Sequence, residues 1–251
     1  MRVAWIDCSA GASGDMLLGA FLDAGADLAA VNAAVAAVDP SLSVTVDQTS
    51  RHQIAATKAS VRVEGELHPE NFPDTAGHAH GEGHGDGHGH GHGHGQEDAG
   101  HRHGGSGTTT RTWAEVRRLI EAAGLADPVR ARALDTFARL ARAEATAHGV
   151  EPDAVHFHEV GALDAIADIV GVAAASVSLE LDRIVVSTIS LGGGGQVRGQ
   201  HGGVPVPGPA VLHLLSEAEA PVVGGTAPYE MTTPTGAALL ASLADEFGLL
   251  P

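Results

Sequence analysis

The chain has 251 residues, of which 43% are hydrophobic and only 3% aromatic, and its 14 basic and 31 acidic side chains give a formal charge of −17. This length permits one large or two modest domains with an aliphatic core. The charge argues against sequence-independent nucleic-acid binding, which needs a basic surface. A single cysteine, Cys8, excludes an internal disulfide. Without a recognisable signal peptide or membrane-length apolar run, the chain is expected to be soluble and cytoplasmic.

Hydrophobic periodicity predicts strands and helices that alternate around glycine turns. In chain order the pattern predicts a strand at 2–6, a turn at 9–14, helices at 16–24 and 28–38, strands at 42–46 and 59–63, helices at 112–123, 128–148 and 160–179, a strand at 183–187, loops at 192–195 and 204–209, and helices at 209–215 and 234–247. The strands at 42–46 and 59–63 alternate polar and apolar residues, and an antiparallel pair is one arrangement for them. The alternation favours an α/β fold with a mainly parallel sheet flanked by helices. We expect one such domain over residues 1–251.

A glycine-spaced tract between His78 and His103 holds nine of the sixteen histidines. Glycine removes both packing surface and helical preference, so residues 66–110 are predicted to be a disordered, flexible insertion. Neutral imidazole binds Ni, Zn, Cu and Co, which predicts metal capture. The alternative is a solvated low-complexity insert without a role. The predicted ligands are His78, His80, His84, His88, His90, His92, His94, His101 and His103.

The turn at 9–14 joins the end of a predicted strand to the start of a predicted helix. Parallel sheets bind ligands at such strand ends, and helix N-termini attract anions. Gly11 and Gly14 permit close backbone approach, and together with Ser13 we assign them to cofactor binding. The spacing fits neither a dinucleotide-binding fingerprint nor a P-loop.

Two acidic residues flank this turn. Asp7 and Asp15 are predicted to bind a divalent ion or to polarise a substrate group. The alternative is that Ser13 or Asp15 caps the helix while Asp7 ties down the turn. Cys8 fits a small buried residue better than a thiolate ligand.

A second cluster contains the sequence HFHE and the start of the following helix. In an extended segment His156 and His158 lie on one side while Phe157 packs inward. Asp164 and Asp168 are four residues apart and share one helix face. With Glu159, these side chains predict a mixed nitrogen and oxygen site for Ni, Mn or Zn. The alternative is that each residue is an ordinary core or surface residue.

A third stretch, 199–209, is predicted to be a rigid loop before a helix. A fourth, 230–236, begins a helix and is rich in hydroxyls. Thr233 as N-cap and Pro234 in the first turn explain it structurally. Alternatively, Thr232 and Thr233 hold a phosphate of a bound cofactor.

Four segments together resemble the family of nickel insertion proteins of lactate racemase maturation (the LarC family). They are the opening motif IDCSAGASGDMLLGAFLDAG, the central motif VHFHEVGALDAIADIVG, the loop motif HGGVPVPGPAVLHLL and the terminal motif YEMTTPTGAALLASL. The resemblance covers essentially the whole chain, with one departure at Ala12, where a bulkier aliphatic residue is usual. Such proteins continue into a further C-terminal domain, associated with CTP binding, which we expect to be absent from these 251 residues.

The resemblance implies a CTP-dependent nickel chelatase whose substrate is a pyridinium-3,5-bisthiocarboxylic acid mononucleotide. Ni²⁺ would be inserted between the two thiocarboxylates, with Mg²⁺ or Mn²⁺ assisting CTP, and lactate racemase would accept the product. We assign catalytic roles to Asp7, Asp15, His158, Glu159 and Asp168, and expect a homo-oligomer. The alternatives are a non-catalytic nickel metallochaperone or buffer, which the histidine tract alone predicts, and a metal-dependent hydrolase.

Overall fold

The computed structural model describes the chain except for residues 52, 65, 68–110, 158–162, 200–201 and 226. The predicted insertion and its nine histidines therefore lie outside the described residues, apart from Glu66 and Leu67. His158 and Glu159 lie outside them as well. Residues 1–68 and 108–251 belong to one compact unit.

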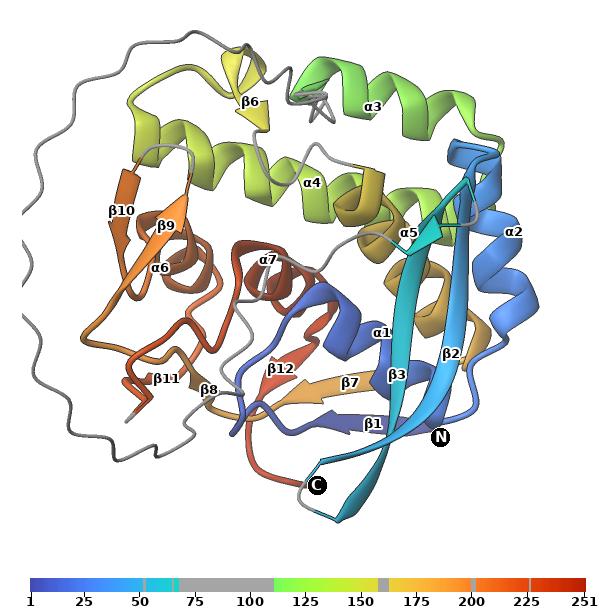
Figure 1. The fold of residues 1–251 in the computed structure, drawn as a ribbon, viewed down its shortest axis with the longest axis horizontal. Coiled ribbons are helices and arrows are strands. Elements are labelled where there is room, and N and C mark those ends of the chain that lie inside the picture. The colour runs from blue at the N-terminus through green and yellow to red at the C-terminus, as the bar shows by residue number, and fades with distance from the viewer. Residues whose placement is uncertain (52, 65, 68–110, 158–162, 200–201, 226) are drawn as a thin grey trace, which may run out of the picture. The chain divides into compact units, whose positions relative to one another are not determined.

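This unit contains a parallel sheet with strand order β1-β7-β12, as Figure 1 shows. Strands β1 (Val3–Ile6) and β12 (Glu246–Phe247) both run parallel to the middle strand β7 (Arg183–Val186). A second parallel pair consists of β8 (Ile189–Ser190) and β11 (Val222–Val223). The predicted α/β class with a parallel sheet is confirmed.

Helices occupy the positions that the periodicity predicted, with shifts of a few residues at their ends. They are α1 (Gly14–Asp23), α2 (Leu28–Val38), α3 (Trp113–Ala122), α4 (Asp127–His148), α5 (Leu163–Ser178), α6 (Pro209–Glu217) and α7 (Pro234–Leu243), with a short 3-10 helix η1 (Pro152–Ala154). Helix α5 is buried over most of its surface because it contacts α1, α2, α4 and α7. None of the helices described is long and apolar enough to cross a membrane.

Antiparallel pairs complete the fold. Strands β2 (Leu42–Arg51) and β3 (Ile54–Val63) form a ten-residue hairpin, which confirms antiparallel pairing and extends the predicted strands, and β4 (Glu66–Leu67) pairs with β3. The remaining pairs are β5 (Arg111–Thr112) with β6 (His156–Phe157), and β9 (Gln196–Gly199) with β10 (Gly202–Pro205).

Two predicted boundaries were wrong. The last helix ends at Leu243 instead of 247, because Ala244 is extended and Asp245 pairs with the sheet: its N–H donates to Ile184 O at 2.9 Å and its carboxylate accepts from Ile184 N at 2.7 Å. The predicted loop 204–209 begins inside strand β10, where Val204 pairs with Val197. In both places a partner distant in sequence determines the local conformation.

The core is aliphatic, as composition predicted, and three of its aromatic residues form a cluster at α4. Trp113 and Phe137 have ring centroids 6.4 Å apart, and Phe137 and Phe157 are 6.0 Å apart. Phe157 is 1% exposed whereas His156 is exposed, which confirms that Phe157 packs inward. The described start of the HFHE segment is thereby anchored to α4.

Candidate functional site

The opening turn leaves the carboxyl end of β1 as a compact loop. Ser9 N donates to Asp7 Oδ1 at 2.9 Å, and Gly11 N donates to Cys8 O at 3.0 Å. The side chain of Asp7 therefore ties down the turn, as its structural alternative proposed. The residue is exposed, so it also presents negative charge at the strand end.

Main-chain contacts join the opening turn to the terminal motif. Ala12 N donates to Met231 O and Thr233 N donates to Ala12 O, both at 3.0 Å, and Ala12 forms an isolated parallel bridge with Thr232. Gly11 has a φ of +83°, and a Cβ on it would lie 1.9 Å from Met231 O. Only glycine fits there, because both the backbone conformation and the close approach exclude a side chain.

The start of α1 holds a pair of polar side chains. Ser13 occupies the N-cap position but accepts no backbone hydrogen bond with its side chain. Its hydroxyl donates instead to Asp15 Oδ1 in the first turn of the helix. The capping alternative is therefore wrong for Ser13, whose hydroxyl orients the half-buried carboxylate of Asp15. The helix dipole favours a negative charge at this position.

Asp168 brings the central motif to the same place. A Cβ on Gly14 would lie 2.6 Å from Asp168 Oδ2 and 2.8 Å from Asp168 Cβ, so this carboxylate of α5 packs directly against the first residue of α1. Asp164, one turn earlier in α5, is half-buried like Asp168. The two clusters that the sequence presents separately therefore meet at the α1–α5 contact.

Of the two histidines predicted as ligands in the HFHE segment, only His156 lies within the described residues. His156, on β6, lies beside the capping box of α3, where the pKa of Glu115 is lowered mainly by the hydrogen bond from Thr112 N–H and to a small extent by His156. The described part of the chain contains no group of three His, Cys, Asp or Glu side chains that could hold a metal ion. Because His158 and Glu159 lie outside that part, the mixed nitrogen and oxygen metal site stays a prediction.

The two threonines assigned to phosphate binding have structural contacts. Thr232 is completely buried, and its hydroxyl donates to Ser190 O at 2.7 Å. Thr233 is the N-cap of α7 and accepts from Gly236 N at 3.1 Å, with Pro234 in the first turn. The predicted cap is confirmed. The Thr232 hydroxyl holds the terminal motif against Ser190, whereas the Thr233 hydroxyl caps its own helix, and phosphate binding by either one stays a prediction.

A second glycine turn, 192–195, was predicted only as a loop. Gly192 has a φ of +76°, and a Cβ on it would lie 1.9 Å from Tyr229 O; a Cβ on Gly195 would lie 2.4 Å from Pro228 O. Gly193 N donates to Ala227 O at 3.0 Å. These contacts pack the turn after β8 against the segment that leads from β11 to α7.

Glu230 is a carboxylate that the sequence prediction did not assign. It is half-buried, and its Oε1 lies 3.9 Å from the Cβ position of Gly208 in the loop motif. The loop motif and the terminal motif therefore meet at Glu230. The sequence signal that could have identified Glu230 is its position directly before the hydroxyl-rich start of α7.

The four motifs thus form one connected assembly. The terminal motif contacts the opening motif through Ala12, the central motif reaches it through Asp168 at Gly14, and the loop motif joins at Glu230. The opening turn and the second glycine turn both follow parallel strands. This is the edge at which open α/β sheets place their ligands.

Cys8 lies at the base of this assembly, where its N–H donates to Ser187 Oγ at 2.8 Å. Burial and, to a smaller extent, the charge of Asp7 raise the pKa of the Cys8 thiol to about 12. A hydrogen bond with Ser187 acts in the opposite direction. Because only the thiolate reacts, native Cys8 is expected to be alkylated about 1000-fold more slowly at pH 8 than a free cysteine. The intact mass after iodoacetamide treatment, with and without urea, measures this, and rapid labelling of native protein contradicts it.

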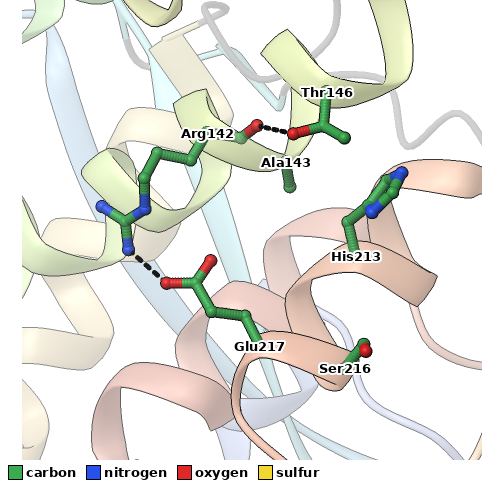
Figure 2. Close-up of a pocket in the computed structure, with 6 residues that line it drawn as sticks. All are labelled: Arg142, Ala143, Thr146, His213, Ser216 and Glu217. Carbon is green, nitrogen blue, oxygen red and sulfur yellow. Dashed lines mark hydrogen bonds and ion pairs between the residues drawn. The ribbon is translucent and has the colours of Figure 1, made fainter.

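A separate pocket of about 360 Å³ lies between α4 and α6, and Figure 2 shows its lining. Arg142 Nη2 and Glu217 Oε1 form an ion pair of 2.7 Å there, beside His213. No residue that the sequence predicted as a site residue lines this pocket. The pocket is therefore separate from the predicted site residues, although His213 belongs to the loop motif.

The fold and the site define an α/β protein in which glycine turns and carboxylates lie together at the ends of parallel strands. Residues 4–251 match the family model described as nickel insertion protein. A Nocardioides protein named pyridinium-3,5-bisthiocarboxylic acid mononucleotide nickel insertion protein is 45% identical over 100% of this chain and 53% of its own length. An Acetivibrio thermocellus protein of the same name is 34% identical over 100% of this chain and 54% of its own.

A Roseiflexus castenholzii relative, named putative nickel insertion protein, is 38% identical over 97% of this chain and 51% of its own length. The chain belongs to the nickel insertion protein family. It spans about half the length of the curated relatives that it matches. No solved structure matches the chain.

Proposed function

We propose that this chain is the nickel-handling part of a CTP-dependent nickel chelatase. It would insert Ni²⁺ into a pyridinium-3,5-bisthiocarboxylic acid mononucleotide in the cytoplasm and so form the nickel pincer cofactor that lactate racemase uses. One observation carries the proposal: the family motifs converge on a carboxylate-bearing turn at the ends of parallel strands, where Asp168 packs against Gly14.

The carboxylates suit the chemistry of this reaction. Formation of a nickel–carbon bond at the pyridinium ring requires the loss of a ring proton, and a positioned carboxylate or imidazole is the general base for such a step. Asp15 and Asp168, at the α1–α5 contact, are the described candidates. Their oxygen atoms also suit a hard cation such as Mg²⁺ or Mn²⁺, which would neutralise the phosphates of CTP, whereas the imidazoles of His156 and His158 suit Ni²⁺.

The histidine tract would gather nickel for this site. A chain lacking residues 78–103 is expected to need a higher nickel concentration for half-maximal insertion but to reach the same rate at saturating nickel. A matched control keeps the length and replaces the nine histidines by asparagine, which separates imidazole chemistry from spacing. Insertion rates over a nickel titration measure the effect, and complete loss of insertion at saturating nickel contradicts this division of labour.

The histidine tract also favours a second candidate, a nickel metallochaperone or buffer without catalysis. Incubation of the chain with nickel, CTP and the dithiolated pyridinium substrate, with and without a separately supplied C-terminal portion, distinguishes the two. Mass spectrometry detects the nickel-containing product if the chain takes part in insertion. A buffer binds nickel and forms no product in either arm.

A further inference from the structure

Tyr229 is the only tyrosine of the sequence and the only exposed aromatic residue in the part of the chain that the structure describes. It is 60% exposed, whereas the three aromatic residues of the cluster at α4 are buried. An aromatic ring stabilises a fold through the area that it buries, so a ring left mostly in water contributes little. The packing of the fold therefore does not account for a tyrosine at this position.

The main chain that carries Tyr229 is held in place by the glycine turn 192–195. Tyr229 O lies 1.9 Å from the Cβ position of Gly192, so the two backbones are in direct contact. Two residues further on, Met231 N donates to Leu191 O at 3.2 Å. Because this main chain is already ordered, binding of a ligand to the side chain would cost little conformational entropy.

The tip of the same turn leaves open space beside this main chain. Gly194 is exposed, and no atom lies within 4 Å of its Cβ position apart from its own chain neighbours. The Cβ position of Gly193 has one neighbour, Gly225 O at 3.7 Å. Glycine at such a place allows a flat ligand to approach the backbone closely.

Tyr229 also lies close to the opening turn. Met231 O accepts from Ala12 N at 3.0 Å, and the Cα atoms of Tyr229 and Met231 are at most about 7 Å apart because only two residues separate them. Ser190 N donates to Cys8 O at 3.1 Å, which places the end of β8 beside the end of β1. A ligand held by Tyr229 would therefore lie at the strand ends on which the four motifs converge.

We propose that the ring of Tyr229 stacks on the pyridinium ring of the substrate mononucleotide and so positions it beside the opening turn. This inference rests on the proposed function, which supplies the substrate. A pyridinium ring is flat and carries a positive charge, and the electron-rich face of a tyrosine attracts such a cation. The cytosine ring of CTP is also flat but uncharged, so it lacks this attraction.

The dissociation constant of the dithiolated pyridinium mononucleotide tests the contact. It is measured by isothermal titration calorimetry with the full chain in EDTA, without nickel, CTP or the C-terminal portion. Tyr229→Leu keeps an apolar side chain but removes the aromatic face, and it is expected to raise the dissociation constant about fivefold. Tyr229→Phe, the matched control, keeps that face and should stay within about twofold of the parent chain. Equal binding by the parent chain and the leucine variant overturns the inference, as does a parent chain that binds no mononucleotide.

A second pair of ligands isolates the charge of the ring. Nicotinamide mononucleotide has a cationic pyridinium ring, and its reduced form has the same substituents on an uncharged ring. The parent chain is expected to bind the cationic form about fivefold more tightly, and Tyr229→Leu should bind the two forms alike. If Tyr229→Leu weakens binding of cytidine monophosphate as much, the ring belongs to the cytosine site and the inference is overturned.

These outcomes are distinct from failure of the proposed function. Binding is measured without nickel, so a parent chain that forms no nickel-containing product would contradict nickel insertion, while the effect of Tyr229→Leu on the dissociation constant would remain visible. If Tyr229 instead contacts the C-terminal portion, the leucine variant would need more of that portion for half-maximal insertion and would bind the mononucleotide as tightly as the parent chain. That result would overturn the inference and leave the proposed function in place.

Discussion

Alanine at position 236 is expected to lower the free energy of unfolding by about 3 kcal/mol, although alanine is the better helix former. Gly236 lies in the first turn of α7, and a Cβ there would lie 2.2 Å from Ala12 O and 2.9 Å from Ser13 N. These are backbone atoms of the opening turn, so no side-chain rotation can relieve the clash. The start of α7 must then separate from the turn, and the hydrogen bond from Thr233 N to Ala12 O lengthens.

The urea midpoint measures this loss, and Gly224→Ala is the matched control. Gly224 has no atom within 4 Å of its Cβ position and no positive φ, so its substitution should change stability by less than about 0.5 kcal/mol. Local helix propensity alone predicts the opposite sign for Gly236→Ala. A variant at 236 as stable as the parent chain would show that the two motifs are not in contact.

Much of the fold follows from local sequence patterns. The apolar run before Asp7, the glycine turn and the helix that follows were predictable because each depends on neighbours within a few residues. The same holds for the cap at Thr233, whose side chain needs only the first turn of its own helix. The motif residues were also recognisable, since their types are unusual for a core or a plain surface.

Long-range pairing explains the parts of the fold that local sequence patterns could not predict. Glu246 and Phe247 have a helix-compatible pattern, yet they form a strand because β7 supplies a partner at Val185 and Val186. The two-residue strands β8 and β11 are too short to produce a periodic signal. The position of Asp168 against Gly14 depends on the packing of α5 on α1, which no local pattern reports.

Replacing Asp168 by asparagine is expected to lower the rate of nickel insertion by about 100-fold or more at saturating nickel, since general acid–base groups contribute factors of this size. Asparagine keeps the shape of the side chain and removes its charge and its ability to accept a proton. The fold should persist, so the urea midpoint of the variant serves as a check. Insertion is measured with the C-terminal portion supplied.

Two further variants distinguish the effect of the negative charge of Asp168 on the insertion rate from the effect of its position. Asp127→Asn, at an exposed residue of α4 paired with Arg130, should leave the insertion rate unchanged. Asp168→Glu keeps the charge but adds a methylene where Asp168 already packs against Gly14, and we expect it to recover only part of the rate. Full recovery by glutamate would mean that negative charge near the start of α1 suffices. Full activity of Asp168→Asn would remove this carboxylate from the reaction and leave Asp15, which Ser13 orients, as the described candidate for the base.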